Sequence, residues 1–178
     1  MIVIGIDPGL ASTGYGVIER RAGRFMAHDG GVIETPAGAP TERRLTSIAA
    51  QARAILDAYS CEALAFEDLY FGQNIVSAFA VGQARGVLML LAGERSIPCF
   101  SYTPQQVKAS VCGHGGAAKD QVARMVAALL ALPSPPGPDH ASDALAVALC
   151  HANSAPMRAA ILASEARQTA APQGAGAA

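Results

Sequence analysis

The first twenty residues, MIVIGIDPGLASTGYGVIER (1–20), decide the fold. Residues 2–6 form a continuous apolar run rich in β-branched side chains, which is typical of a strand covered on both faces. The run ends at Asp7, which Pro8 and Gly9 follow directly. A carboxylate at the end of a buried strand is costly unless it has a partner. Asp7 therefore either caps a turn or holds a cation.

The rest of the chain predicts alternating strands and helices. Expected strands cover 13–20, 24–35, 61–68 and 97–103, and expected helices cover 41–60, 74–96, 104–112, 119–132 and 139–153. Thr41 is the expected N-cap of the first helix, and Thr103 with Gln106 forms an expected capping box. Three meandering strands followed by two strands fed through helices predict an α/β fold. Its five-stranded mixed sheet, a three-strand meander plus two parallel strands, carries helices on both faces.

The 178 residues suffice for one domain with a sizeable core. We expect that domain to cover residues 1–153. From Ser154 the chain is rich in Ala, Gln, Gly and Pro without periodicity, which predicts a disordered tail over 154–178. The chain shows no targeting signal and its apolar runs are short, so we expect a cytoplasmic protein without a membrane span.

Charge and cysteine content restrict the possible ligands. The formal net charge is −1, so binding to nucleic acid would have to depend on a local basic patch. The two lysines of the chain, Lys108 and Lys119, lie in one segment. A zinc site is disfavoured because the spacing of its potential ligands matches no known template; those ligands are Cys112, His114, Cys150 and His151.

Acidic residues lie at the ends of two expected apolar strands and near the start of the last expected helix. Asp7 and Glu67 each end an expected strand, and Asp143 lies in the first turns of the last expected helix, three residues after His140. A common cluster of these groups would be stable only with bound cations. Carboxylates favour Mg²⁺ or Mn²⁺, and a histidine among them tolerates Mn²⁺.

Each acid also has a purely structural interpretation. Glu67 could face solvent, with Asp68 as the inward residue, because neighbouring strand residues face opposite sides. Asp139 and Asp143 could cap the last helix and complement its dipole. Composition and spacing leave these alternatives open.

Five segments together resemble the RuvC family of Holliday-junction resolvases. They are GIDPGLASTGYGVI (5–18), FEDLYFGQN (66–74), GQARG (82–86), PQQVKASVCGHGGAAKDQV (104–122) and HASDALAVALCH (140–151). The resemblance runs in order over residues 1–153. It implies a ribonuclease H-like fold and a homodimer that cuts four-way DNA junctions in recombination and repair. It also implies contact with the RuvA-RuvB branch-migration complex.

The family's acidic tetrad falls on Asp7, Glu67, His140 and Asp143, which the resemblance implies to be catalytic and metal-binding. The expected cofactor is Mg²⁺, two ions per subunit, for which Mn²⁺ can substitute. The position of His140 is Asp in some members of the family. Asp139 lies one residue before the position that matches the family's ligand, and we assign it to capping of the last expected helix.

The resemblance also implies residues that bind DNA. Lys108 and Lys119 match basic residues that bind phosphate, although both could be solvated helix-face charges. Tyr70 matches an aromatic that stacks on bases, with Phe71 beside it; without the family, such a pair would more often belong to a core.

Small side chains on the expected helix 74–96 offer a dimer interface. Ala78, Gly82 and Gly86 recur at helical spacing and would let another backbone approach closely. Packing within the chain explains the same pattern equally well.

Three rival functions remain to be weighed. An actin-like nucleotide-binding protein needs a second Asp-x-Gly loop and more length than this chain has. A non-catalytic junction-binding protein is disfavoured because all four tetrad positions hold ligating residue types. A nuclease of the same fold acting on RNA is the nearest alternative.

Overall fold

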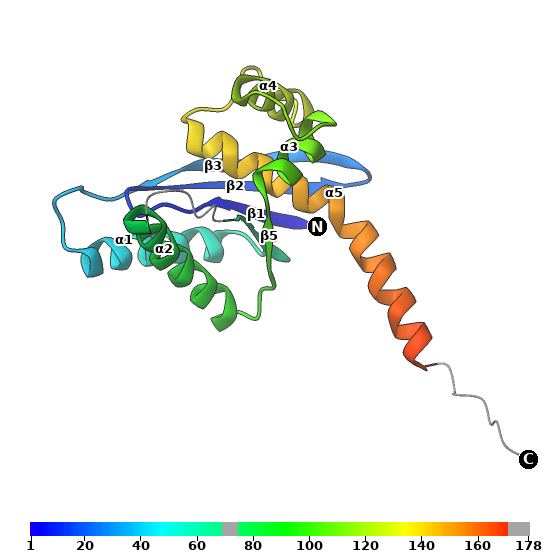
Figure 1. Ribbon diagram of the computed structural model, residues 1–178, viewed down its shortest axis with the longest axis horizontal. Helices are drawn as coiled ribbons and strands as arrows, with labels where there is room; N and C mark the ends of the chain where they lie inside the picture. The colour runs from blue at the N-terminus through cyan, green and yellow to red at the C-terminus, as the bar shows by residue number, and fades with distance from the viewer. Residues whose placement is uncertain (69–74, 171–178) are drawn as a thin grey trace, which may run out of the picture.

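The computed structural model describes residues 1–68 and 75–170, with the side chain of residue 75 and those beyond residue 155 left out of the description. Its centre is one sheet of five strands (Figure 1): β1 (Ile2–Asp7), β2 (Ser12–Arg21), β3 (Arg24–Glu34), β4 (Ala63–Glu67) and β5 (Cys99–Tyr102). The strand order is β3-β2-β1-β4-β5. β1 pairs antiparallel with β2 and parallel with β4. The predicted mixed sheet is confirmed.

Five helices complete the described part of the chain: α1 (Thr41–Ala58), α2 (Ile75–Glu94), α3 (Pro104–Cys112), α4 (Lys119–Leu129) and α5 (Asp139–Ala170). The capping box of Thr103 and Gln106 at the start of α3 is present. The prediction for Thr41 is wrong. Pro40 is the N-cap of α1, without a side-chain hydrogen bond, and Thr41 is already helical. The carbonyl oxygen of Pro40 accepts from the backbone N–H groups of Arg43 and Arg44.

Two apolar layers cover the two faces of the sheet. Figure 1 shows α1 and α2 on one side and α3, α4 and the first part of α5 on the other. Neighbouring residues of β1 divide between the layers: Val3 belongs to the core under α3, α4 and α5, and Ile4 to the core under α1 and α2. Burial on both faces explains why residues 2–6 are apolar without alternation.

The last helix is longer than the sequence indicated. The prediction placed a disordered tail from Ser154, but α5 continues as a helix to Ala170. The composition explains the difference, because Ala, Leu, Glu, Arg and Gln favour helix strongly even where no apolar stripe repeats. In Figure 1 this extension projects away from the sheet. Residues 171–178 lie outside the described part of the chain.

One described helix, α2, is long and apolar enough to cross a membrane by length and composition alone. Core helices also meet that criterion. Ala84, Leu88, Leu91 and Ala92 of α2 are at most 1% exposed and pack in the core with α1 and the sheet. The apolar character of this face is therefore explained by the fold itself.

Candidate active site

The first two acids lie side by side at one edge of the sheet. β1 and β4 are parallel neighbours, with Ile6 opposite Phe66, and each strand ends on the next residue. The strand ends therefore place Asp7 and Glu67 next to each other. The sequence could predict this arrangement, because the carboxyl ends of parallel strands lie at the same edge of a sheet.

Glycines in the strands bring α5 to the same edge. A Cβ at Gly5 would lie 2.0 Å from the carbonyl oxygen of Ala144, and one at Gly14 would lie 2.0 Å from that of His140. The α5 backbone thus rests directly on β1 and β2, which no side chain larger than hydrogen would permit. This approach carries His140 and Asp143 to the strand ends. The role of these glycines was not predicted from the sequence, although their place inside strands was the available signal.

Asp7 and His140 form a close pair. Their Oδ2 and Nδ1 atoms lie 2.6 Å apart, and the Asp7 side chain is 18% exposed. Burial raises the pKa of the Asp7 carboxyl, an effect that the hydrogen bond from His140 opposes. In the tautomer with the proton on Nδ1, the imidazole donates to Asp7 and leaves the Nε2 lone pair available to a metal.

Glu67, rather than Asp68, is the inward acid of its segment. Burial, followed by the charges of Asp7 and Asp143, raises the pKa of Glu67 to about 7. Asp68 is 44% exposed and faces Arg85 instead. The three carboxylates are therefore close enough to repel one another, as the sequence analysis expected of a shared cluster.

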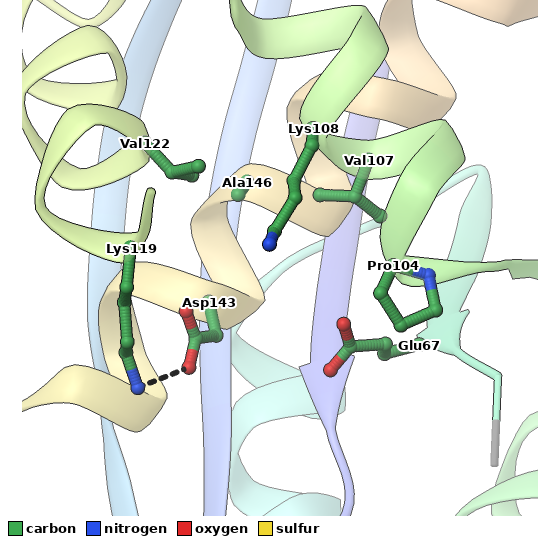
Figure 2. A pocket seen from close by; sticks show the side chains of 8 residues that line it. All are labelled: Glu67, Pro104, Val107, Lys108, Lys119, Val122, Asp143 and Ala146. Carbon is green, nitrogen blue, oxygen red and sulfur yellow. Dashed lines mark ion pairs between the residues drawn. The ribbon is translucent and has the colours of Figure 1, made fainter. Parts of the chain in front are cut away.

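A cavity of about 200 Å³ lies beside these acids (Figure 2). Its lining residues are Glu67, Pro104, Val107, Lys108, Lys119, Val122, Asp143 and Ala146. Lys108 reaches into it from α3 and Lys119 from the start of α4. The Lys119 Nζ atom lies 3.0 Å from Asp143 Oδ2 and 3.3 Å from Asp139 Oδ2. Both lysines thus bring positive charge to the acidic cluster.

The donor set fits a hard divalent cation. Three carboxylates and one imidazole are the ligand types that Mg²⁺ and Mn²⁺ accept, and a cation would offset the repulsion that raises the pKa of Glu67. As the side chains are oriented, the described residues contain no group of three or more His, Cys, Asp or Glu arranged to hold a metal ion. Three of the four proposed ligands are engaged in other contacts: His140 and Asp7 with each other, and Asp143 with Lys119.

Other predicted residues lie elsewhere. Tyr70 and Phe71 fall outside the described residues. Ala78, Gly82 and Gly86 are on α2 and do not line the cavity. Of these three, Gly86 is exposed, whereas Ala78 and Gly82 are partly buried.

Residues 3–151 match the family model described as crossover junction endodeoxyribonuclease RuvC. A RuvC crossover junction endodeoxyribonuclease of Moorella thermoacetica is 49% identical over 158 residues, covering 89% of this chain and 95% of that protein. One of Chloroflexus aggregans is 46% identical over 156 residues, covering 88% of this chain and 95% of the relative.

A solved structure shows the same fold. Thermus thermophilus RuvC in complex with a Holliday junction substrate matches with a TM-score of 0.85 and 39% sequence identity. The match covers 89% of this chain and 96% of the Thermus chain. The ribonuclease H-like α/β fold expected from the sequence is thereby confirmed.

Proposed function

The chain belongs to the RuvC family of crossover junction endodeoxyribonucleases, and on this basis we propose that Asp7, Glu67, His140 and Asp143 form its cleavage site. It is a metal-dependent hydrolase that resolves four-way DNA junctions in recombination and repair. One observation carries the assignment of the site: two partly buried acids end adjacent parallel strands, and α5 brings a third acid and a histidine to the same edge.

The four side chains would hold two Mg²⁺ ions, for which Mn²⁺ would substitute. When bound, the ions would activate water and stabilise the leaving oxygen during hydrolysis of the phosphodiester. The chain's own contribution is to hold the ligands. β1 and β4 fix Asp7 and Glu67 on rigid backbone, and Asp7 orients the His140 ring through Nδ1. Walls formed by Val107, Val122 and Ala146 make one side of the cavity apolar.

Phosphate would be bound by Lys108 and Lys119. Both side chains line the cavity beside Glu67 and Asp143, so a phosphate drawn to them would lie next to the acids. Charged contacts of this kind position the DNA backbone without reading its sequence. Tyr70 and Phe71, which follow Glu67 closely in the chain, are proposed to stack on bases at the crossover.

Resolution of a junction needs two symmetric nicks, and one site makes one nick, so we propose a homodimer. The interface at Ala78, Gly82 and Gly86 remains a prediction, and we extend it along α2 to include exposed apolar side chains. A stripe of exposed apolar side chains runs along the helix: Val76 (80% exposed), Phe79 (68%), Met89 (44%) and Leu90 (62%). Gly86 lies on this face, and a Cβ there would meet nothing within 4 Å. We place the interface on this stripe.

Contact with the RuvA-RuvB branch-migration complex remains a prediction from the family alone. The same holds for the cytoplasmic location, which is where such an enzyme would meet the chromosome. RNA is the alternative substrate, and cleavage of an RNA–DNA hybrid compared with a four-way junction distinguishes the two.

Separate assays of binding and cleavage test the site. Asp7→Asn, Glu67→Gln and Asp143→Asn should each abolish cleavage of a synthetic four-way junction. Binding of the junction in a gel should remain within a few fold of wild type, because the lysines are intact. Normal cleavage by any one variant would remove that residue from the site.

Charge placed on the stripe tests the dimer. Phe79→Glu and Leu90→Glu should give a monomer in sedimentation and uncouple the two nicks on a cruciform plasmid, so that nicked circles accumulate instead of linear product. Met26→Glu is the matched control, since Met26 is also 44% exposed but lies on β3. A stable dimer in both stripe variants would move the interface to another surface.

A further inference from the structure

A half-buried arginine of α2 holds the end of the strand that carries Glu67. The side chain of Arg85 is 15% exposed. Its Nη1 atom donates to the main-chain carbonyl oxygen of Glu67 at 3.0 Å, and its Nη2 atom donates to Ser101 Oγ on β5. One side chain therefore ties α2 to both strands at the edge where the acidic cluster lies.

Arg85 also contacts the residues on either side of Glu67. Its guanidinium lies over the Phe66 ring, 5.1 Å from the ring centroid. Its Nη2 atom lies 3.6 Å from Asp68 Oδ1. Three successive residues are thus held by one group, through an aromatic face, a carbonyl oxygen and a carboxylate. A planar guanidinium can make these contacts at once, whereas the single ammonium of a lysine cannot.

The position of Glu67 makes this support consequential. Glu67 is the last residue of β4, and its partner across the sheet is Tyr102, the last residue of β5. Sheet pairing therefore holds its backbone on one flank, and the carbonyl bond from Arg85 adds a second restraint. The direction of the Glu67 carboxylate depends on this backbone, so loss of the restraint would displace the side chain.

We propose that Arg85 is a positioning residue that fixes the end of β4 and thereby directs the Glu67 carboxylate toward the metal. The inference rests on the proposed role of Glu67 as a ligand. It gives a function to the GQARG segment (82–86), which otherwise enters the account only through Gly82 and Gly86. Arg85 does not line the cavity, and the acid with which it pairs is Asp68, so we infer that it acts through the strand.

Metal binding measured by calorimetry, apart from cleavage, tests this role. Residues that orient a ligand cost about 10–100-fold in metal affinity or activity when removed. Arg85→Ala should weaken Mn²⁺ binding at least tenfold and slow junction cleavage, with junction binding in the absence of metal unchanged. Arg85→Lys keeps a charge and one possible hydrogen bond, and should recover part of the affinity. If Arg85→Ala does not fold, Arg85→Lys is measured alone and should bind Mn²⁺ several-fold more weakly than wild type.

The matched control is Arg95→Ala. Arg95 is also partly buried, donates to a main-chain carbonyl, that of Leu91, and pairs with Asp57 at 2.7 Å, but it follows the far end of α2. This variant should leave Mn²⁺ binding unchanged even if its melting temperature falls.

Two outcomes overturn the inference, and they differ from failure of the site assignment. If Arg85→Ala binds Mn²⁺ as tightly as Arg95→Ala does, Arg85 has only a structural role. Where Arg85→Lys is the variant measured, Mn²⁺ affinity equal to that of wild type would give the same conclusion. Weaker metal-free junction binding with normal Mn²⁺ affinity would make it a DNA contact. If Glu67→Gln binds Mn²⁺ and cleaves as wild type does, the proposed function of Glu67 has failed instead.

Discussion

Both faces of the sheet bury large apolar side chains, but the two faces differ in how closely a helix backbone approaches the strands. Under α1 and α2, large side chains fill the space, among them Ile48, Leu88 and Leu91 at 0–1% exposure. On the other face, α5 lies on the glycines of β1 and β2 at backbone distance. At these glycines no side chain separates the helix from the strands, so the helix has little freedom to shift there. The rigid contact lies where His140 and Asp143 must be placed accurately.

Substitution of a strand glycine that lies against α5 should have the largest effect on cleavage. Gly14→Ala would put a Cβ 2.0 Å from the His140 carbonyl oxygen, so the first turn of α5 must move. We expect junction cleavage to fall to background, together with a loss of stability of roughly 1–3 kcal/mol from overpacking. Gly93→Ala in α2 is the control, since a Cβ there meets nothing within 4 Å, and it should cleave normally. Full activity of Gly14→Ala would show that the close approach is unnecessary.

Changing the histidine sharpens the role of the α5 face. His140→Ala removes a proposed ligand and the partner of Asp7, and should lower the cleavage rate roughly 10–100-fold. His140→Asp supplies another ligating oxygen and should keep most of the activity. Asp139→Ala is the neighbouring control and should cleave normally. A greater loss for Asp139→Ala than for His140→Ala would show that the register at the start of α5 was assigned wrongly.

A change of pH should alter the affinity for metal by a smaller, graded amount. Burial and the neighbouring acids raise the pKa of Glu67 to about 7, so the metal-free site holds a proton below that pH. A metal must displace this proton. Mn²⁺ affinity should therefore increase as pH rises toward 7, by up to about tenfold per unit, and level off above it. Calorimetry in two buffers of different ionisation enthalpy would show the released proton, and an affinity independent of pH from 5 to 7 would contradict this.

The same proton affects folding. A raised pKa means that the folded state binds more protons than the unfolded state between pH 4.5, the ordinary pKa of a glutamate, and about pH 7. Without metal, this group's contribution to stability therefore falls as pH rises through that window. Glu67→Gln should remove that part of the pH dependence of the melting temperature.

A cavity on the opposite face should have the smallest effect on the chemistry. Leu88→Ala removes a side chain that is 1% exposed in the α1–α2 core, and should cost about 2–5 kcal/mol of unfolding free energy. Cleavage at a temperature where the variant remains folded should be close to wild type. A large loss of cleavage under that condition would mean that both faces position the site.

The strands and the acids at their ends were predictable because local patterns encode them. A β-branched run marked β1 and a short apolar run marked β4, and their terminal acids stood out against apolar neighbours. The local pattern alone could not show whether Glu67 or Asp68 points inward, since one residue of register reverses the faces; the family resemblance selected Glu67. In the structure, Asp68 is 44% exposed and pairs with Arg85 of α2, the helix that follows β4.

Other features depended on tertiary contacts that no local pattern reveals. The contact of Gly14 with His140 joins residues far apart in the chain. The apolar face of α2 looked nearly uniform in sequence, so only the packed sheet separates buried Leu88 from exposed Leu90. The end of α5 at Ala170 was missed because helix propensity, rather than periodicity, favours it there.

The central claim, that this edge of the sheet is a metal-dependent site for cutting four-way DNA junctions, is tested most directly by one cleavage assay. The purified protein would be incubated with a synthetic four-way junction, a linear duplex of the same sequence and an RNA–DNA hybrid, each with Mg²⁺ or with EDTA. We predict paired nicks in the junction with Mg²⁺ only, and intact duplex and hybrid throughout. Cutting of the hybrid in preference to the junction, or cutting of the junction in EDTA, would contradict the account.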